Sequence, residues 1–412
     1  MVSDGQAVLI GGVLPDRRAV DVYVAAGVIT AVVATGAKVP EGCEQYRLDG
    51  RLLLPALVEP HAHLDKAFVA ATVTNETGDL YGAMAAMDRA LRGWQFTHDG
   101  IVERASKAIE MLIGNGVTVV RTHVNVGARI GASHIEAIVQ ARRAYQHLID
   151  IEIVALTQQP LAGSLGLENR AALAAALTAG ADLVGACPHL DEDPVACVDV
   201  AFDAAEDAGL GIDLHTDETL DADMLSLRDM ARAVQARGFG RRVAASHCVS
   251  LSMLPLAEQR AVALEVAAAG IAVIPQPHTN LYLQGRGVAS AMPRGLTPID
   301  VLRDAGVLVA AGGDNVQDPF NPLGRCDPLE TAALLVLAGH QLPDAAYAMV
   351  SNDAREVMGR ARVEIAVGAP ADFVAMPVAS MREAIATAVP DRLVFRAGRL
   401  VASSTWQTTI HR

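Results

Sequence analysis

Eight short apolar segments alternate with alanine-rich helical segments through most of the 412-residue chain, and this alternation constrains the fold more than any other feature. Strands are predicted at residues 52–63, 117–126, 150–158, 182–189, 211–217, 242–248, 270–277 and 306–314. Several helical segments between them end in glycine, which often caps a helix C-terminus. Eight strand–helix pairs predict an α/β fold of the (β/α)8 type, a TIM barrel. The alternative is a doubly wound open sheet, which usually carries a glycine-rich turn after its first strand, whereas this first strand ends in His-Ala-His.

The two ends of the chain have a different pattern, with short alternating apolar runs joined by glycine turns. Such runs are typical of hairpins. We therefore expect residues 1–54 and 365–412 to form one small β-sandwich domain together, while residues 55–364 form the barrel.

The charge and composition of the chain argue against several classes of partner. The formal net charge is -14 and no basic run is present, which argues against nucleic acid or an anionic membrane. The first residues lack the pattern of a signal peptide, and no apolar run approaches the roughly 20 residues that span a bilayer. The five cysteines are widely spaced without a Cys-x-x-Cys pair, so we expect free thiols and a cytoplasmic location.

Polar residues of the types that bind metals or move protons gather at the ends of the predicted strands. In a TIM barrel these C-terminal strand ends form the active face. Most of the twelve histidines lie there. The residues at or just past the strand ends are His61, His63, His123, Gln158, His189, His215, Glu218, His247, His278 and Asp314. Taken singly, His189 and His278 are better interpreted as hydrogen-bonded core histidines.

The His-Ala-His sequence that ends the first strand predicts a metal site. Residues two apart on a strand point to the same face, so His61 and His63 can converge on one ion. His215 and Asp314 add a third imidazole and a carboxylate from two other strand ends. This set suits one divalent metal ion such as zinc or iron. A two-metal site bridged by a carboxylated lysine from the middle of the barrel is excluded, because no lysine follows Lys107.

Three further strand-end residues suggest roles around this ion. Glu218 lies three residues after His215, where a carboxylate can take a proton from a water molecule and pass it on. The alternative is a charge that favours a helix N-terminus. His247 can stabilise the water or the tetrahedral intermediate, and Gln158 offers a donor and an acceptor to a heterocycle edge.

These residues lie in motifs that resemble the amidohydrolase superfamily and, within it, the bacterial cytosine deaminases. The motifs are VEPHAHLDK, RTHVNV, ADLVGACPH, LHTDE, ASHCVS, NLYLQGR and GGDNVQDPFNPLG, which span nearly the whole chain. The resemblance implies a barrel with a small β domain from both termini, and it implies a homo-oligomer. It also implies one metal bound by His61, His63, His215 and Asp314. Glu218 and His247 would then be catalytic, and Gln158 would hold the substrate.

The chain departs from the cytosine deaminase pattern at three positions. Asn125 and Asn315 stand where that family has aspartate, and Phe320 stands where it has tryptophan. An amide has donors that a carboxylate lacks, so a different ring edge is expected to be recognised. The Gly-Gly-Asp-Asn sequence is also similar to that of the isopropylammelide hydrolases, but those relatives lack the equivalent of Glu218.

The predicted function is a metal-dependent hydrolytic deaminase that releases ammonia from a small amino-heterocycle, cytosine or a related pyrimidine or triazine ring. The alternative is a hydrolase that releases an alkylamine from an N-alkylated ring, as the isopropylammelide hydrolases do. A barrel that only binds a ligand is disfavoured, because the chain keeps every ligand and Glu218. Asp314 is expected to act with Glu218 and His247 in catalysis. The predicted substrate contacts are Gln158, Asn315, Phe320, Gln284 and His123.

Overall fold

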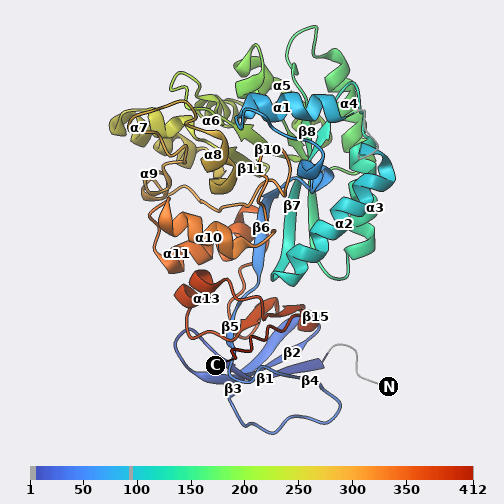
Figure 1. The fold of residues 1–412 in the computed structure, drawn as a ribbon, viewed down its shortest axis with the longest axis vertical. Helices are drawn as coiled ribbons and strands as arrows, with labels where there is room; N and C mark the ends of the chain where they lie inside the picture. The colour runs from blue at the N-terminus through green and yellow to red at the C-terminus, as the bar shows by residue number, and fades with distance from the viewer. Residues whose placement is uncertain (1–5, 92–95, 412) are drawn as a thin grey trace.

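The computed structural model describes residues 6–91 and 96–411, so residues 1–5 and 412 of the predicted terminal ranges lie outside the described residues. A barrel forms the larger part of the molecule, and a smaller β-sheet body that contains both ends of the described chain packs below it (Figure 1). No helix among these residues combines the length and the apolar character required to cross a bilayer.

The barrel is built from seven parallel strands within the described residues, in the order β6-β7-β8-β9-β10-β11-β12. The strands are β6 (Leu57–Ala62), β7 (Val117–Val126), β8 (Asp150–Thr157), β9 (Leu183–Gly185), β10 (Gly211–Thr216), β11 (Val243–His247) and β12 (Ala272–Ile274). Sequential strands are neighbours throughout, as strand–helix repeats require. The predicted TIM barrel is confirmed.

The eighth predicted strand, residues 306–314, closes the ring by single bridges rather than by a continuous ladder. Val309 bridges Val273 on one side, and Asp314 bridges Ala62 on the other. The ladder is interrupted because the N–H of Ala311 donates to the carbonyl oxygen of Met349 instead of to a strand.

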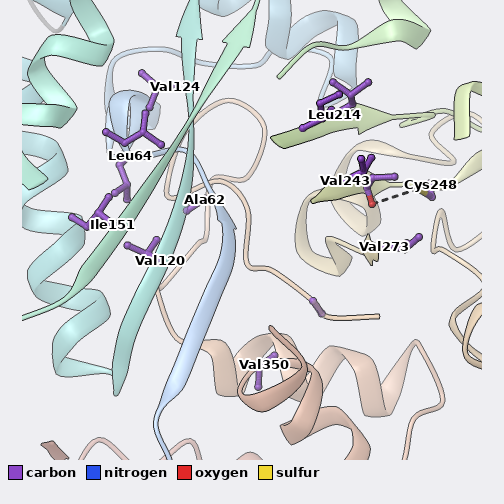
Figure 2. Close-up of a cluster of buried hydrophobic side chains, with 14 of the residues drawn as sticks. Ala62, Leu64, Val120, Val124, Ile151, Leu214, Val243, Cys248, Val273 and Val350 are labelled. Atoms are coloured by element: carbon purple, nitrogen blue, oxygen red, sulfur yellow. Dashed lines mark hydrogen bonds between the residues drawn. The ribbon is translucent and has the colours of Figure 1, made fainter. Parts of the chain in front are cut away.

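Helices cover the outside of the barrel and bury an extensive apolar core against the strands. The helices that follow β6 to β12 are α2 (His98–Gly114), α3 (Ser133–Tyr145), α4 (Leu167–Ala179), α5 (Pro194–Ala208), α6 (Ser226–Arg237), α7 (Leu256–Ala268) and α9 (Ile299–Asp304). Val120, Ile151, Leu214 and Val243 lie in this core (Figure 2). The predicted glycine caps are present: Gly180, for example, ends α4 with a φ of 117°.

Six further α-helices lie within residues 6–91 and 96–411. They are α1 (Leu80–Ala90), α8 (Pro277–Leu283), α10 (Pro328–Leu337), α11 (Pro343–Met349), α12 (Asn352–Val357) and α13 (Met381–Thr387). Helix α1 lies across the upper end of the barrel (Figure 1). That is the end at which the parallel strands terminate, so α1 is placed to cover an active face.

The terminal residues form one mixed sheet of eight strands in the described part of the chain, in the order β15-β14-β13-β5-β1-β2-β3 with β4 paired to β1. They are β1 (Gln6–Val13), β2 (Ala19–Ala25), β3 (Val28–Ala34), β4 (Glu44–Arg47), β5 (Leu52–Pro55), β13 (Phe373–Met376), β14 (Leu393–Arg396) and β15 (Arg399–Ser403). Leu9, Val22, Leu53, Phe373 and Phe395 share a separate apolar cluster, so the sheet encloses its own core. Both termini build this body, as the sequence predicts.

The prediction of a single strand over residues 52–63 is wrong. The segment contains β5, which belongs to the terminal sheet, and β6, which belongs to the barrel. The N–H of Ala56 donates to Asp372 in the terminal body, whereas the N–H of Leu57 donates to Gly116 beside the barrel. An unbroken apolar run hides this change of partner, because both strands are buried.

Arg392 ties the terminal body to the barrel. Its guanidinium is 1% exposed and donates to both carboxylate oxygens of Asp327, at 2.9 and 2.7 Å. It also donates to the carbonyl oxygens of Asn115 at 2.6 Å and Val389 at 2.8 Å. Asp327 caps the start of α10 and Asn115 ends α2, so one side chain joins three segments.

Arg392→Met is expected to lower the free energy of unfolding by roughly 3–5 kcal/mol, because it leaves the Asp327 carboxylate buried without its cation. Urea unfolding followed by circular dichroism measures this. Arg18→Ala, which breaks an exposed pair with Asp16, serves as the control and should unfold with the wild type. Equal midpoints for all three proteins would contradict the anchoring role of Arg392.

Candidate metal centre and active site

The four predicted metal ligands meet at the active face of the barrel. His61 lies on β6, His63 is the first residue after β6, and His215 lies on β10. Oδ1 of Asp314 is 3.1 Å from Nε2 of His63 and 3.5 Å from Nε2 of His61. Nε2 of His215 is 3.2 Å from Nε2 of His63. All four side chains are buried, so residues up to about 250 positions apart share one small volume.

The unpartnered atoms of this group fit a divalent metal ion. Within the described residues, Nε2 of His61 and both carboxylate oxygens of Asp314 are buried without a hydrogen-bond partner. Buried polar atoms are rarely left unsatisfied, and a cation between them satisfies several at once. Three imidazole nitrogens and one carboxylate are a ligand set that zinc and iron accept.

Neighbouring groups orient the imidazoles for this task. Nδ1 of His61 lies 2.9 Å from Oγ of Ser246, and that hydroxyl donates to Oδ1 of Asp213 at 2.8 Å. The hydroxyl therefore accepts from Nδ1–H, which leaves Nε2 of His61 unprotonated and available to a metal. Nδ1 of His63 likewise lies 3.0 Å from the carbonyl oxygen of His123 and must donate to it.

A buried charge network lies one layer deeper in the barrel. Arg121 donates to Glu152 and to Asp213, both at 2.7 Å. Burial would raise the pKa of Asp213, but the charges of His123 and Arg121 hold that pKa below its ordinary value. Asp213 therefore remains an anion that supports Ser246, and through Ser246 it supports His61.

Glu218 follows β10 and faces the same volume. Its Oε1 accepts a hydrogen bond from Nδ2 of Asn280 at 3.4 Å and lies 3.7 Å from Nδ1 of His247. Burial raises the pKa of Glu218 well above its usual value, and the charge of Asp314 adds to the rise while that of Lys66 opposes it. The side chain is thus placed to hold a proton next to the predicted metal ligands.

His247 ends β11 as a neutral imidazole. Nδ2 of Asn280 donates to its Nδ1 at 3.2 Å, so the ring proton resides on Nε2. Burial lowers the pKa of His247 to about 3, which disfavours the charged form. Within the described chain Nε2 has no hydrogen-bond partner. His247 therefore presents a free donor toward the site, and its ring centroid lies 5.3 Å from that of His61 and 4.9 Å from that of His215.

The backbone is strained at three strand ends around the site. Asp217, His247 and Asp314 have φ values of 53°, 72° and 66°, in the left-handed region that non-glycine residues rarely occupy. Such conformations persist where surrounding bonds enforce them, and they gather at functional sites. The carboxylate of Asp217, for example, accepts from the N–H groups of Ser226 and Leu227 at the start of α6.

A cavity of about 380 Å³ opens directly onto the metal group. Its base includes His63, His215, Glu218, His247 and Asp314. Other polar wall residues include Lys66, Asp88, Asn125, Arg129, Gln158 and Asn315. Helix α1 supplies an apolar wall that includes Leu80, Met84 and Met87. Its size is within the range of small-molecule pockets, about 300–1,000 Å³.

The predicted substrate contacts fall into two groups. Gln158, Asn315 and Phe320 line the cavity. Gln284 lies outside its wall, where its amide donates to the carbonyl oxygen of Glu218 at 3.0 Å. His123 lies behind the metal group, with its ring stacked on His61 at 3.9 Å between centroids. Gln284 and His123 therefore support site residues rather than face the cavity.

The remaining strand-end residues have structural partners. The amide of Asn315 donates to Asp318 at 2.7 Å and accepts from Thr279 at 3.2 Å, so it is held in place. Nδ1 of His189 contacts the carbonyl oxygen of His215 at 3.2 Å, and Nε2 of His278 contacts Thr331 at 3.1 Å.

Sequence reasoning missed several residues of the site. Arg121 and Asp213 each precede a strand-end histidine by two positions, and this spacing places them on the inward face of the same strand. That signal could have found them. No pattern in the sequence indicates that Met84 or Met87 comes to the site, because α1 follows a long connection after β6.

A barrel whose strand ends gather three imidazoles, a carboxylate and a buried glutamate defines a class, the metal-dependent barrel hydrolases. The chain belongs to the amidohydrolase family, whose model matches residues 156–402.

Three relatives are similar over nearly the whole chain. The pterin deaminase of Rhizobium rhizogenes is 31% identical, over 93% of this chain and 88% of its own. The 5-methylcytosine deaminase of Klebsiella pneumoniae, solved with 5-fluorocytosine, superposes with a TM-score of 0.88 at 25% identity, over 98% of this chain and 99% of its own. The N-isopropylammelide isopropylaminohydrolase of Burkholderia multivorans has a TM-score of 0.83 at 28% identity, over 97% and 98%.

Proposed function

We propose that the protein is a metal-dependent hydrolytic deaminase that releases ammonia from an amino-heterocycle. The observation that carries the proposal is the placement of Glu218 and His247 on the cavity wall beside the predicted metal ligands. The relatives named as deaminases of a pterin and of 5-methylcytosine support the substrate class.

The metal ligands in this proposal are His61, His63, His215 and Asp314. A divalent ion held there, zinc or iron, supplies the Lewis acidity that lowers the pKa of a water molecule toward neutrality. The unpartnered nitrogen of His61 and the unpartnered oxygens of Asp314 support this assignment.

In the proposed reaction Glu218 moves the proton. One carboxylate oxygen, Oε1, is fixed by Asn280, and the other takes a proton from water and delivers it to a ring nitrogen of the substrate. Water attacks the ring carbon that bears the amine, the hydroxyl group formed on that carbon gives up its proton to the amine, and ammonia leaves while a carbonyl remains on the ring. His247 donates from Nε2 to the oxygen that adds to this carbon.

The substrate of the proposal is a flat amino-heterocycle oriented by Gln158 against Phe320. The cavity extends along the apolar wall of α1, past Met84 and Met87, which supports two-ring substrates of the pterin type as well as cytosine-like rings. The test is ammonia release from pterin, cytosine, 5-methylcytosine and aminotriazines by protein loaded with zinc, iron or manganese. Absence of ammonia from every compound would reject the proposal.

A second candidate activity is release of an alkylamine from an N-alkylated triazine. The similarity to the isopropylammelide hydrolase and the presence of Asn315 favour it. The identity of the released amine separates the two activities, because the deaminase gives ammonia and the alternative gives an alkylamine.

Gly127→Ala is expected to raise KM about 2- to 10-fold with a smaller change in kcat, which corresponds to the loss of one hydrogen bond. A Cβ on Gly127 would lie 2.2 Å from Oε1 of Gln158, so the amide must move. Steady-state kinetics measures the effect. Gly114→Ala, where a Cβ meets no atom within 4 Å, is the control. An unchanged KM in Gly127→Ala would remove Gln158 from the substrate contacts.

The proposal extends to the organisation of the protein. We propose domains of residues 1–54 plus 365–412 and of residues 55–364, a homo-oligomer, and action in the cytoplasm on a small molecule rather than on nucleic acid. The separate apolar cluster of the terminal sheet supports the division, and the net charge of -14 supports the choice of partner. The five free cysteines agree with a reducing compartment.

A further inference from the structure

Lys66 places a buried positive charge on the wall of the cavity without an anionic partner. The residue is 4% exposed and its side chain lines the cavity. Within the described residues its ammonium forms no hydrogen bond and no ion pair. The ammonium lies over the ring of Phe320, with Nζ 4.9 Å from the ring centroid.

Two carboxylates on which the charge of Lys66 acts, those of Asp65 and Asp318, have other partners. Asp65 accepts from His134 at 2.9 Å and from the N–H of Asn125 at 3.1 Å. Asp318 accepts from Asn315 at 2.7 Å and from the N–H groups of Phe320 and Asn321. These bonds hold both carboxylates in place, and neither forms an ion pair with the lysine, although Oδ1 of Asp65 has no hydrogen-bond partner among the described residues.

Lys66 shares the cavity wall with Glu218 and Phe320, and its charge acts on acids from two segments. Burial raises the pKa of Asp318 to about 7, and Lys66 opposes that rise. Lys66 opposes the rise at Glu218 as well. Glu218 lines the same cavity as Lys66, and Phe320, two residues after Asp318, lies beside the ammonium.

A buried ammonium without an acceptor is unfavourable, and lysine is rarely buried unless it is paired. A ligand that brings an oxygen into the cavity removes this penalty and gains a charge-assisted hydrogen bond. A ring that stacks on Phe320 and turns its amine-bearing carbon toward Glu218 presents an adjoining edge to Lys66.

We propose that Lys66 is a specificity-determining residue that binds a ring oxo oxygen of the substrate, so that the enzyme acts on oxo-substituted amino-heterocycles. This inference rests on the proposed deaminase function. It predicts discrimination between two rings that differ only in the oxo group, such as pterin and the same ring without it, or cytosine and the aminopyrimidine without it.

The test compares such a pair in the wild type and in Lys66→Met, which keeps the apolar stem over Phe320 and removes the charge. For the oxo substrate, KM is expected to rise roughly 10- to 100-fold, the range for a hydrogen bond to a charged group. For the ring without the oxo group, KM should be unchanged. Lys107→Met is the matched control, because Lys107 also lies over an aromatic ring, that of Phe68 at 4.1 Å, but away from the cavity.

Equilibrium binding separates failure of this inference from failure of the proposed function. Calorimetric titration of metal-loaded protein with lumazine or uracil needs no turnover. The comparison compounds are the same rings without the oxo oxygen that the amino substrate already carries. Tighter binding of the oxo compounds that is lost in Lys66→Met supports the inference even if no ammonia is released. Equal affinity of the wild type for both members of a pair overturns it, as does an equal weakening of both by Lys66→Met.

Discussion

Replacing Glu218 by glutamine is expected to lower ammonia release by about 10²–10⁴-fold while the metal content stays that of the wild type. The amide has nearly the shape of the carboxyl group and keeps an acceptor for Asn280, but it cannot carry a proton from water to the ring. Ammonia release under saturating substrate and metal analysis of the same sample measure the two effects.

Glu168→Gln is the matched control, since Glu168 is exposed in the first turn of α4, outside the wall of the cavity. Its turnover should equal that of the wild type. If Glu218→Gln turned over substrate at a near-wild-type rate, Glu218 would have no role in proton transfer. Loss of metal in Glu218→Gln would instead indicate that the carboxylate helps to hold the ion.

His61→Ala is expected to leave the purified protein with less than one metal ion per chain and with little activity. The change removes one of the three imidazoles proposed to hold the ion and leaves the Asp314 carboxylate, which is 1% exposed, with one fewer ligand beside it. Even an outer partner of a metal ligand contributes about 10–100-fold to affinity, and loss of a ligand should exceed that. Metal analysis after dialysis against a chelator measures the result.

Ser246→Ala provides a graded comparison, because it keeps the imidazole of His61 and removes only the acceptor of its Nδ1 proton. Its metal affinity should fall about 10–100-fold. His98→Ala is the matched control for loss of an imidazole, because His98 is exposed and its ring contacts Gln140. Its metal content should equal that of the wild type. Full metal occupancy in His61→Ala would remove His61 from the ligand set.

The barrel and the polar ring at its active face could be predicted from sequence because both follow from local patterns. Apolar strands alternate with helices, and the fold then brings all the strand ends together whatever their separation in the chain. The strand over residues 52–63 could not be divided, because Ala56 is as apolar as its neighbours and the change of partner depends on Asp372, far away in sequence.

Substrate contacts are harder to predict than metal ligands because they depend on how loops and side chains pack. His123 lies at a strand end and Gln284 lies in the NLYLQGR motif, so the sequence places both at the active face. Each nevertheless supports another residue instead of facing the cavity. Asn315 faces the cavity, but Asp318 already binds its amide. Lys66 lies beside the His-Ala-His motif, and only its burial without an ion pair in the structure points to a role in substrate binding.

The junction between β5 and β6 makes the terminal sheet part of the scaffold of the active site. His61 lies five residues after Ala56, a distance of roughly 16 Å along an extended strand, and both flanks of Ala56 are hydrogen-bonded. If the hydrogen bonds of the terminal sheet break, β6 loses its support at Ala56 and the imidazole of His61 will therefore move. On heating, we expect release of the metal to coincide with unfolding of that sheet, so the protein's working temperature range is set as much by its two chain ends as by its barrel.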